Sequence, residues 1–189
     1  MTAKDGRSFC AGGDLKDVRE NLMSTEAAAV MHQQMSATLS RLSSLPSFLI
    51  AAQEGAAVGG GAELITYCDR IVSAKHSRIG FVHASLGVSP GWGGGAQLLS
   101  KIGRNAALQF LISAKMWHVE ECLRVGLVDR IVESGQALPE VLSEVDRYLK
   151  YPHDSLRGIL DLVKGGGVEK DIFLSLWGKE AHRRALGLN

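Results

Sequence analysis

"AAVGGGAEL", residues 56–64, joins an apolar segment to three consecutive glycines and then to residues that favour a helix. Because glycine has no side chain, the unpaired N–H groups at such a helix start are open to an approaching group, and they favour negative charge. The stretch contains neither the GxxxxGK[ST] pattern of a P-loop nor the GxGxxG pattern of a dinucleotide-binding turn. It leaves two alternatives open: a tight turn required by close packing, or a site for a phosphate or a developing oxyanion.

A second glycine-bearing stretch, "SFCAGGDL" (8–15), also follows a short apolar segment. Two such loops from separate parts of the chain can direct two backbone N–H groups at one carbonyl oxygen. That arrangement is an oxyanion hole, in which the loss of one donor costs about 3–4 kcal/mol in the transition state. A thioester suits this chemistry, because its enolate needs such stabilisation.

A third stretch, "GFVHASLGVSPGWGGG" (80–95), carries one histidine, His83, beside apolar residues. Histidine can donate a hydrogen bond or a proton near neutral pH, so His83 is a candidate catalytic residue. A histidine in such surroundings is also commonly a hydrogen-bonded core residue. The pattern alone leaves both alternatives open.

The hydrophobic pattern predicts strands that alternate with helices, followed by a helical tail. It predicts strands over 48–53, 69–75, 77–83 and 127–133, with a strand end or loop over 1–9. It predicts helices over 24–45, 62–68, 93–103, 104–113, 118–126, 138–150, 154–164 and 169–186. The alternation indicates an α/β fold, with a core over residues 1–135 and a helical C-terminal region of the same domain over 136–189.

The composition is that of an ordinary globular protein, with 46% hydrophobic residues, 22% charged residues and a net charge of +1 over 189 residues. The balanced charge predicts that neither nucleic acid nor an acidic membrane surface is a partner. The sequence contains no run of about 18 apolar residues, so it predicts no membrane span. The three cysteines are far apart and form no CxxC pair, which predicts reduced thiols and no metal site.

Four stretches in this order resemble the enoyl-CoA hydratase/isomerase (crotonase) superfamily. They are "SFCAGGDLK" (8–16), "IAAQEGAAVGGGAELITYCD" (50–69), "LGVSPGWGGGAQLLSKIG" (86–103) and "AKMWHVEECLRVGLVDRIV" (114–132). The resemblance implies a ββα spiral fold, an acyl-CoA substrate and assembly into a homo-trimer or a hexamer. It implies oxyanion-binding N–H groups at Gly13 and Gly60, with Gly13, Asp14, Leu15 and Lys16 lying along the acyl-CoA.

The resemblance also bears on the reaction. Hydratases of this family use two glutamates to handle one water; the first corresponds to Glu63, but the second position holds His83. The segment "IGFVHASLGVSPGWGG" (79–94) and the tail "EKDIFLSLWGKEAHRRAL" (169–186) are similar to the ethylmalonyl-CoA decarboxylase branch. That branch implies decarboxylation of a short 2-alkylmalonyl-CoA, such as ethylmalonyl-CoA or methylmalonyl-CoA, through an enolate.

In that reaction the resemblance implies a role for His83 in orienting the carboxylate or protonating C2. Glu63 would hold His83 or a water. Pro90 and Trp92 would line the acyl pocket, and a packing role for Trp92 stays open beside this one. No metal or organic cofactor is expected, because the thioester is itself the electron sink and coenzyme A is part of the substrate.

Two alternatives accompany this prediction: an enoyl-CoA hydratase or isomerase activity, and a non-catalytic subunit that associates with full-length partners. The second arises because family members carry further strands before the first motif, so the resemblance implies a chain that is truncated at its N-terminus. The expected location is the cytoplasm, with the mitochondrion as the alternative.

Overall fold

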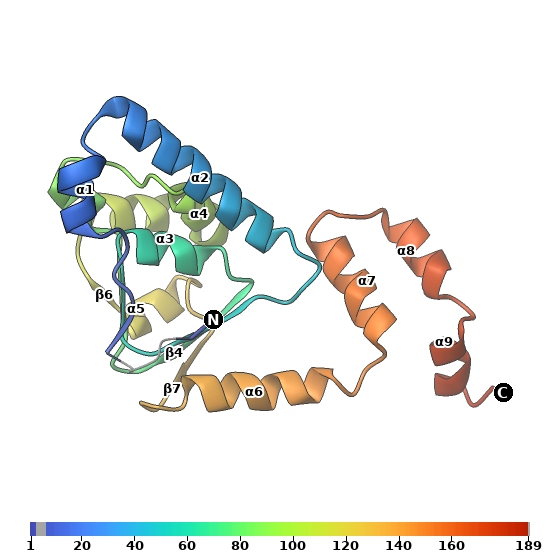
Figure 1. Ribbon diagram of the computed structural model, residues 1–189. Coiled ribbons are helices and arrows are strands. Elements are labelled where there is room, and N and C mark those ends of the chain that lie inside the picture. Colours follow the sequence, from blue (N-terminus) through green and yellow to red (C-terminus); the bar gives the residue numbers. More distant parts are fainter. Residues whose placement is uncertain (3–6, 189) are drawn as a thin grey trace. The chain divides into compact units, whose positions relative to one another are not determined.

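The computed structural model describes residues 1–2 and 7–188, and within them the strands form two sheets (Figure 1). One sheet has the order β1 (Ser8–Cys10), β3 (Ala56–Val58), β5 (Arg78–Gly80) and β6 (Trp117–His118). The other has the order β2 (Ile50–Gln53), β4 (Arg70–Ala74) and β7 (Arg130–Val132). Neighbouring strands are parallel except β5 and β6, which are antiparallel. The α/β fold predicted from the sequence is confirmed.

Helices connect and follow the strands. They are α1 (Leu15–Asn21), α2 (Thr25–Ser43), α3 (Gly60–Thr66), the 3₁₀ helix η1 (Val82–Leu86), α4 (Gly94–Ser113), α5 (Val119–Arg124), α6 (Ala137–Tyr148), α7 (His153–Val163), α8 (Glu169–Leu176) and α9 (Glu180–Ala185). Helices α3 and α4 pack against each other beside the strands (Figure 1). In the described part of the chain, no helix has the length and apolar character needed to cross a bilayer.

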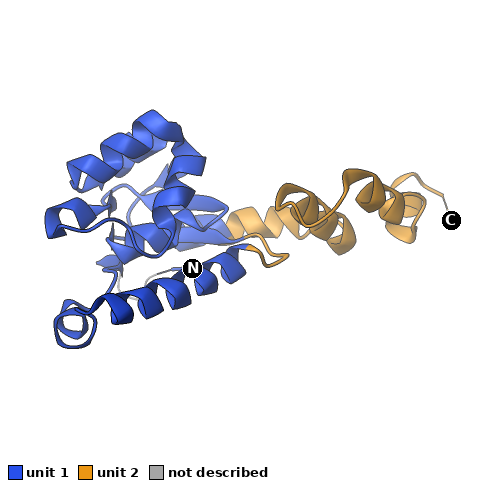
Figure 2. Cartoon of the chain, turned by 90° about the horizontal axis from the view of Figure 1, so that it is seen from above, with its two compact units in different colours: residues 1–43, 49–141 blue, residues 44–48, 142–189 orange. Residues whose placement is uncertain are grey.

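The chain divides into two compact units, coloured separately in Figure 2. The first comprises Met1–Ser43 and Leu49–Val141, and the second comprises Ser44–Phe48 and Leu142–Asn189. The first unit holds both sheets and a core of fully buried side chains, among them Ile65, Ile71, Ile79, Phe81, Leu98 and Phe110. Among the described residues of the second unit, only Glu144 is buried.

The register of β1, β3 and β5 places the three glycine-bearing stretches together. Cys10 pairs with Ala57, and Val58 pairs with Gly80, both in parallel alignment. Parallel strands end at the same edge of a sheet, so the segments that follow β1, β3 and β5 emerge side by side. These segments contain the glycines of the first two loops and His83 of the third.

A buried polar network fixes the passage of the chain from one sheet to the other between β2 and β3. The Gln53 side-chain amide donates to the carbonyls of Gly55 and Arg78, each at 3.0 Å, and its oxygen accepts from the Ser73 hydroxyl at 2.6 Å. Gly55 has φ +80, and a Cβ there would lie 2.3 Å from the carbonyl oxygen of Arg7. The turn therefore requires glycine, and the network keeps a completely buried glutamine satisfied.

Two predicted elements are wrong in detail. The strand predicted over 77–83 ends at Gly80, and His83 lies in the 3₁₀ helix η1, because the backbone leaves the extended conformation after Phe81. The helix predicted over 169–186 is two helices, α8 and α9, interrupted at Gly178, which has φ +70. A residue at such φ cannot continue a right-handed helix.

One predicted pair of helices is confirmed, and some short elements were not predicted. The two helices predicted over 93–103 and 104–113 are the two parts of α4, which is kinked at Gly103 (φ 75, ψ 167). Short elements that the hydrophobic pattern did not separate from their surroundings are α1 and β6, whereas β3 is the apolar segment that leads into Gly59. Of the segment predicted over 1–9, residues 3–6 lie outside the described residues, and Ser8 and Phe9 begin β1.

Candidate active site

The first two glycine loops are in direct backbone contact. A Cβ on Gly12, which has φ +86, would lie 2.8 Å from both the Gly60 nitrogen and the Val58 carbonyl oxygen. A Cβ on Gly61 would lie 2.1 Å from the carbonyl oxygen of Cys10. These distances are too short for any side chain. The close packing that explains the glycines therefore also brings the two loops together.

The two predicted oxyanion-binding residues lie in these loops. The first hydrogen bond within α3 runs from the Glu63 N–H to the Gly59 carbonyl at 3.0 Å, so the Gly60 N–H has no acceptor within its own helix. Gly13 directly follows Gly12, the residue in contact with Gly60, and it is exposed. The fold thus brings the segments that carry the Gly13 and Gly60 N–H groups to one place.

The residues predicted to lie along an acyl-CoA follow at the start of α1. Asp14 is the N-cap of α1, and its carboxylate accepts from the Lys16 N–H at 2.8 Å. The Lys16 ammonium lies 4.0 Å from the Glu20 carboxylate at the surface. Leu15 is 54% exposed although its side chain is apolar. This segment is a charged and apolar surface beside the glycine loops.

Glu63 is almost completely buried, at 1% exposure, and its carboxylate accepts hydrogen bonds on both oxygens. Its donors are the N–H groups of Gly91 (3.1 Å), Trp92 (2.8 Å) and Gly94 (2.9 Å). Burial raises the pKa of Glu63, but the hydrogen bonds from His83 and from these three N–H groups outweigh burial and lower the pKa overall. Glu63 is therefore an ionised side chain that holds the loop preceding α4.

His83 pairs with the same carboxylate. Its Nε2 lies 3.2 Å from the Glu63 Oε1, and its side chain is 12% exposed. Its other ring nitrogen, Nδ1, is buried and has no hydrogen-bond partner among the described residues. The contact suits an Nε2–H that donates to the carboxylate. One nitrogen of His83 is therefore anchored, and the second is buried without a hydrogen-bond partner among the described residues.

Trp92 covers the glycine loop that contains Gly60. A Cβ on Gly60 would lie 2.4 Å from Cη2 and Cζ3 of the Trp92 indole, so the indole rests on the α-carbon of Gly60. Pro90 lies next to Gly95, whose Cβ would be 3.5 Å from the proline ring. Both residues are partly buried. The structure thus brings together His83, Glu63, Gly60 and Trp92, which the sequence predicted from two separate motifs.

Two residues that contact this loop were not predicted. The Tyr67 hydroxyl donates to the Trp92 carbonyl at 2.9 Å, and Nδ1 of His32 lies 2.6 Å from the Gly91 carbonyl oxygen. Tyr67 follows Glu63 by four residues on α3, so helical spacing was a signal that could have found it. His32 is exposed, and no local pattern connects it to Gly91, which is distant along the chain.

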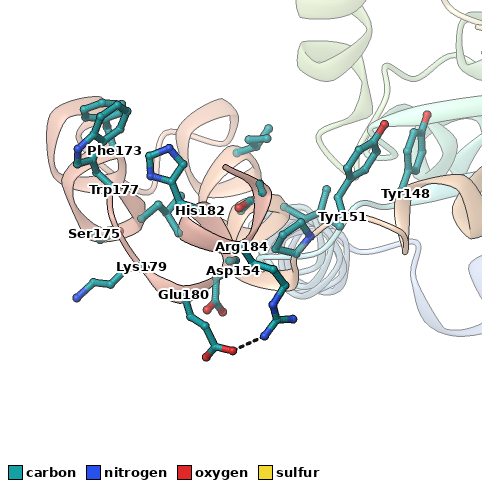
Figure 3. Close-up of a pocket in the computed structure, with 17 residues that line it drawn as sticks. Tyr148, Tyr151, Asp154, Phe173, Ser175, Trp177, Lys179, Glu180, His182 and Arg184 are labelled. Atoms are coloured by element: carbon teal, nitrogen blue, oxygen red, sulfur yellow. Dashed lines mark hydrogen bonds and ion pairs between the residues drawn. The ribbon is translucent and has the colours of Figure 1, made fainter. Parts of the chain in front are cut away.

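A separate cavity of about 1130 Å³ lies within the second unit (Figure 3). Its aromatic lining includes Phe173, Trp177 and His182. The ring centroid of Trp177 lies 5.0 Å from that of Phe173 and 4.5 Å from that of His182. None of the predicted site residues lines it. In the described residues, no three His, Cys, Asp or Glu side chains gather as metal ligands would.

Comparison with known proteins gives a consistent result. The family model described as enoyl-CoA hydratase/isomerase matches residues 1–165. Ethylmalonyl-CoA decarboxylase of Xenopus tropicalis is 37% identical over 95% of this chain and 63% of its own length, and that of Gallus gallus is 36% identical over 96% and 64%. The chain thus spans a little under two thirds of these curated relatives.

The fold is shared with solved structures. A putative enoyl-CoA hydratase/isomerase family protein from Hyphomonas neptunium superposes with a TM-score of 0.90 at 25% identity, over 98% of this chain and 74% of that one. This likeness confirms the crotonase-type fold that the sequence predicted.

Proposed function

Because the chain belongs to the enoyl-CoA hydratase/isomerase (crotonase) family, we propose that it decarboxylates a short 2-alkylmalonyl-CoA such as ethylmalonyl-CoA or methylmalonyl-CoA. The observation that carries the proposal is the pairing of His83 with a Glu63 carboxylate that already accepts three backbone hydrogen bonds. The similarity to relatives named ethylmalonyl-CoA decarboxylase supports the same substrate class.

The surroundings of Glu63 argue against hydration of an enoyl thioester. That reaction needs one group that takes a proton from water and another that gives a proton to the substrate. Both Glu63 oxygens are occupied by donors, and these hydrogen bonds, acting against burial, lower the pKa of Glu63, so it is a poor base. His83 alone cannot fill both roles on one water. Decarboxylation needs no base, because the departing CO2 leaves its electron pair behind.

The proposed reaction begins with cleavage of the bond between C2 and the free carboxylate. The bonding electrons form a C1–C2 double bond, the thioester oxygen takes up the negative charge, and CO2 leaves. The N–H groups of Gly13 and Gly60 stabilise this oxygen; each such donor typically contributes about 3–4 kcal/mol. The thioester serves as the electron sink, so the proposal requires neither a metal nor an organic cofactor.

His83 completes the reaction in this proposal by protonating C2. Glu63 holds Nε2, which fixes the orientation of the ring and stabilises the imidazolium. The unpartnered Nδ1 then carries the proton that is delivered to C2. The proton is replaced from solvent after the product has formed. Trp92, which rests on Gly60, bounds the space beside the reacting carbon.

The test measures CO2 release from ethylmalonyl-CoA by the 189-residue chain and by His83→Gln. We expect kcat to fall about 10²- to 10⁴-fold, because a positioned proton donor contributes that much, while KM changes little. The matched control is His153→Gln, since His153 is exposed in the second unit. Hydration of crotonyl-CoA is measured in parallel. Equal CO2 release by His83→Gln, or hydration faster than decarboxylation, would contradict the proposal.

The proposal includes assembly into a homo-trimer or hexamer in the cytoplasm. Large apolar side chains on the second unit support the assembly, because exposed apolar groups of this kind gain free energy when a partner surface covers them. They include Leu149, Val163 and Trp177, which are 70%, 77% and 60% exposed.

A further inference from the structure

The segment from Gly91 to Gly94, here termed the Trp92 loop, is held from two sides. On one side the Glu63 carboxylate accepts from three of its N–H groups. On the other side the Trp92 carbonyl accepts from the Tyr67 hydroxyl at 2.9 Å, and the Gly91 carbonyl oxygen lies 2.6 Å from Nδ1 of His32. The loop that carries the indole is thus fixed through both its donors and its acceptors.

The Tyr67 hydroxyl is one of the two groups that contact the carbonyls of the Trp92 loop. The Tyr67 side chain is buried, at 4% exposure, and its hydroxyl donates to the Trp92 carbonyl with Ser40 of α2 nearby. A Cβ on Gly93, which has φ +87, would lie 2.3 Å from the hydroxyl oxygen. The phenol therefore occupies the space in which any other residue at position 93 would place its side chain.

One stripe of α2 follows the same loop. Nδ1 of His32 contacts the Gly91 carbonyl, the Cβ of Ser36 would lie 3.8 Å from a Cβ placed on Gly93, and Ser40 lies near the Tyr67 hydroxyl. Residues four apart lie on the same face of a helix, so these three side chains form one polar row. The Tyr67 hydroxyl links this row to the carbonyl of the residue whose indole rests on Gly60.

We propose that Tyr67 is a positioning residue that fixes Trp92 against Gly60 and thereby limits the length of the acyl group that the site admits. The inference rests on the proposed function, in which the Gly60 N–H binds the thioester oxygen and the acyl carbons extend beside the indole. With the hydroxyl removed, the Trp92 carbonyl loses its buried donor, the loop relaxes, and the indole no longer excludes longer chains.

The test compares Tyr67→Phe with the unaltered chain by two measurements that do not depend on turnover. The first is the ratio of dissociation constants for octanoyl-CoA and butyryl-CoA, measured by calorimetry. We expect this ratio to fall about 3- to 10-fold, as the loss of one hydrogen bond of this kind would allow. The second is the ¹⁹F spectrum after incorporation of 5-fluorotryptophan, with the Trp92 signal assigned through Trp92→Phe. We expect only the Trp92 signal to move.

Tyr148→Phe is the matched control, because it removes another hydrogen-bonded phenol, which donates to Glu144 at 2.6 Å in the second unit. It should leave both the affinity ratio and the Trp92 signal unchanged. Ser40→Ala, at an exposed helix position that tolerates alanine, alters the polar row beside the Tyr67 hydroxyl and keeps the test available if Tyr67→Phe does not fold.

The outcomes separate this inference from the proposed function. If the unaltered chain prefers butyryl-CoA over octanoyl-CoA and Tyr67→Phe reduces this preference, the inference is upheld. If the same chain releases no CO2, the decarboxylase is rejected. CO2 release with an unchanged affinity ratio and an unchanged Trp92 signal would reject the inference and uphold the decarboxylase. A chain that binds neither acyl-CoA would overturn the inference.

Discussion

Glu63 illustrates how donors around a carboxylate decide what the carboxylate can do. A buried glutamate with few partners has a raised pKa and can exchange protons near neutral pH. Glu63 is buried as deeply, but it accepts from three backbone N–H groups and from His83. The Glu63 carboxylate therefore holds the Trp92 loop and orients the imidazole of His83.

The shifted pKa of Glu63 has a consequence for stability at acid pH. Burial raises this pKa, but the hydrogen bonds from His83, Gly94, Trp92 and Gly91 lower it below the ordinary value of 4.5 overall. The folded chain therefore takes up this proton less readily than the unfolded chain. The stabilisation is fully present above the unfolded pKa and is lost as pH falls through the folded pKa.

We predict that Glu63→Gln lowers the free energy of unfolding at pH 7 by about 2–4 kcal/mol, because an amide cannot accept from every donor that remains buried. Its unfolding free energy should also decline less than that of the unaltered chain between pH 6 and pH 3. Urea titrations across this range make the measurement. Glu20→Gln, at an exposed position beside Lys16, is the control and should follow the unaltered chain. Identical pH slopes for Glu63→Gln and the unaltered chain would show that Glu63 contributes nothing at acid pH.

At the scale of the elements, the contact between α3 and the end of β1 determines where the loop that follows β1 lies. Gly61 at the start of α3 lies so close to the Cys10 carbonyl that a Cβ would be 2.1 Å from its oxygen. This carbonyl belongs to a strand backbone paired with β3, so it cannot rotate away as a side chain would. The position of the glycine loop that carries Gly13 thus depends on the absence of a single methyl group at Gly61.

Gly61→Ala is accordingly expected to lower the free energy of unfolding by up to about 3 kcal/mol, as overpacking against backbone does. It should also weaken the binding of acyl-CoA, since the loop that carries Gly13 is displaced. Gly166→Ala provides the comparison, because its nearest neighbour would be 3.6 Å from the new Cβ and its φ is not positive. That control should change stability by less than about 1 kcal/mol. Equal urea midpoints for the two variants would refute the argument.

The sequence predicted most of this architecture because apolar runs and glycine clusters act locally. Most strands and helices of the first unit have their own apolar pattern, and the glycines at 59–61 predicted a close approach that the structure contains. The pairing of Glu63 with His83 was among the predicted alternatives. The Trp92 loop anchors were not predicted, because His32 and Gly91 meet only through tertiary packing.

Local signals also failed where one residue ended an element. Gly178 sits within an otherwise helical pattern, and the pattern does not reveal that its φ is +70. The end of β5 at Gly80 was hidden by the apolar residues that continue into η1. Burial, which keeps those residues apolar, does not distinguish a strand from a 3₁₀ helix.

For the chain as a whole, the contrast between its two units matters most. The first has a continuous core, whereas the described part of the second buries Glu144 alone and leaves large apolar side chains exposed. We predict that light scattering after gel filtration will give three or six times the mass of one chain. A single-chain mass would refute homo-oligomer formation. Assembly only after addition of a full-length relative would favour the non-catalytic subunit over the enzyme.

The saturated carboxylate of Glu63 also bears on how one chemistry can evolve into another. A single exchange of His83 for glutamate would supply the residue that a hydratase has there, yet it would place a second carboxyl group beside Glu63, whose Oε1 lies 3.2 Å from Nε2 of His83. Two such acids are not readily ionised together, so one would hold a proton, while the backbone donors of the Trp92 loop would still occupy both oxygens of Glu63. The Trp92 loop would first have to release its hold on Glu63. At this site the proposed decarboxylation and a hydration would thus be separated by the contacts of the Trp92 loop as well as by the residue at position 83.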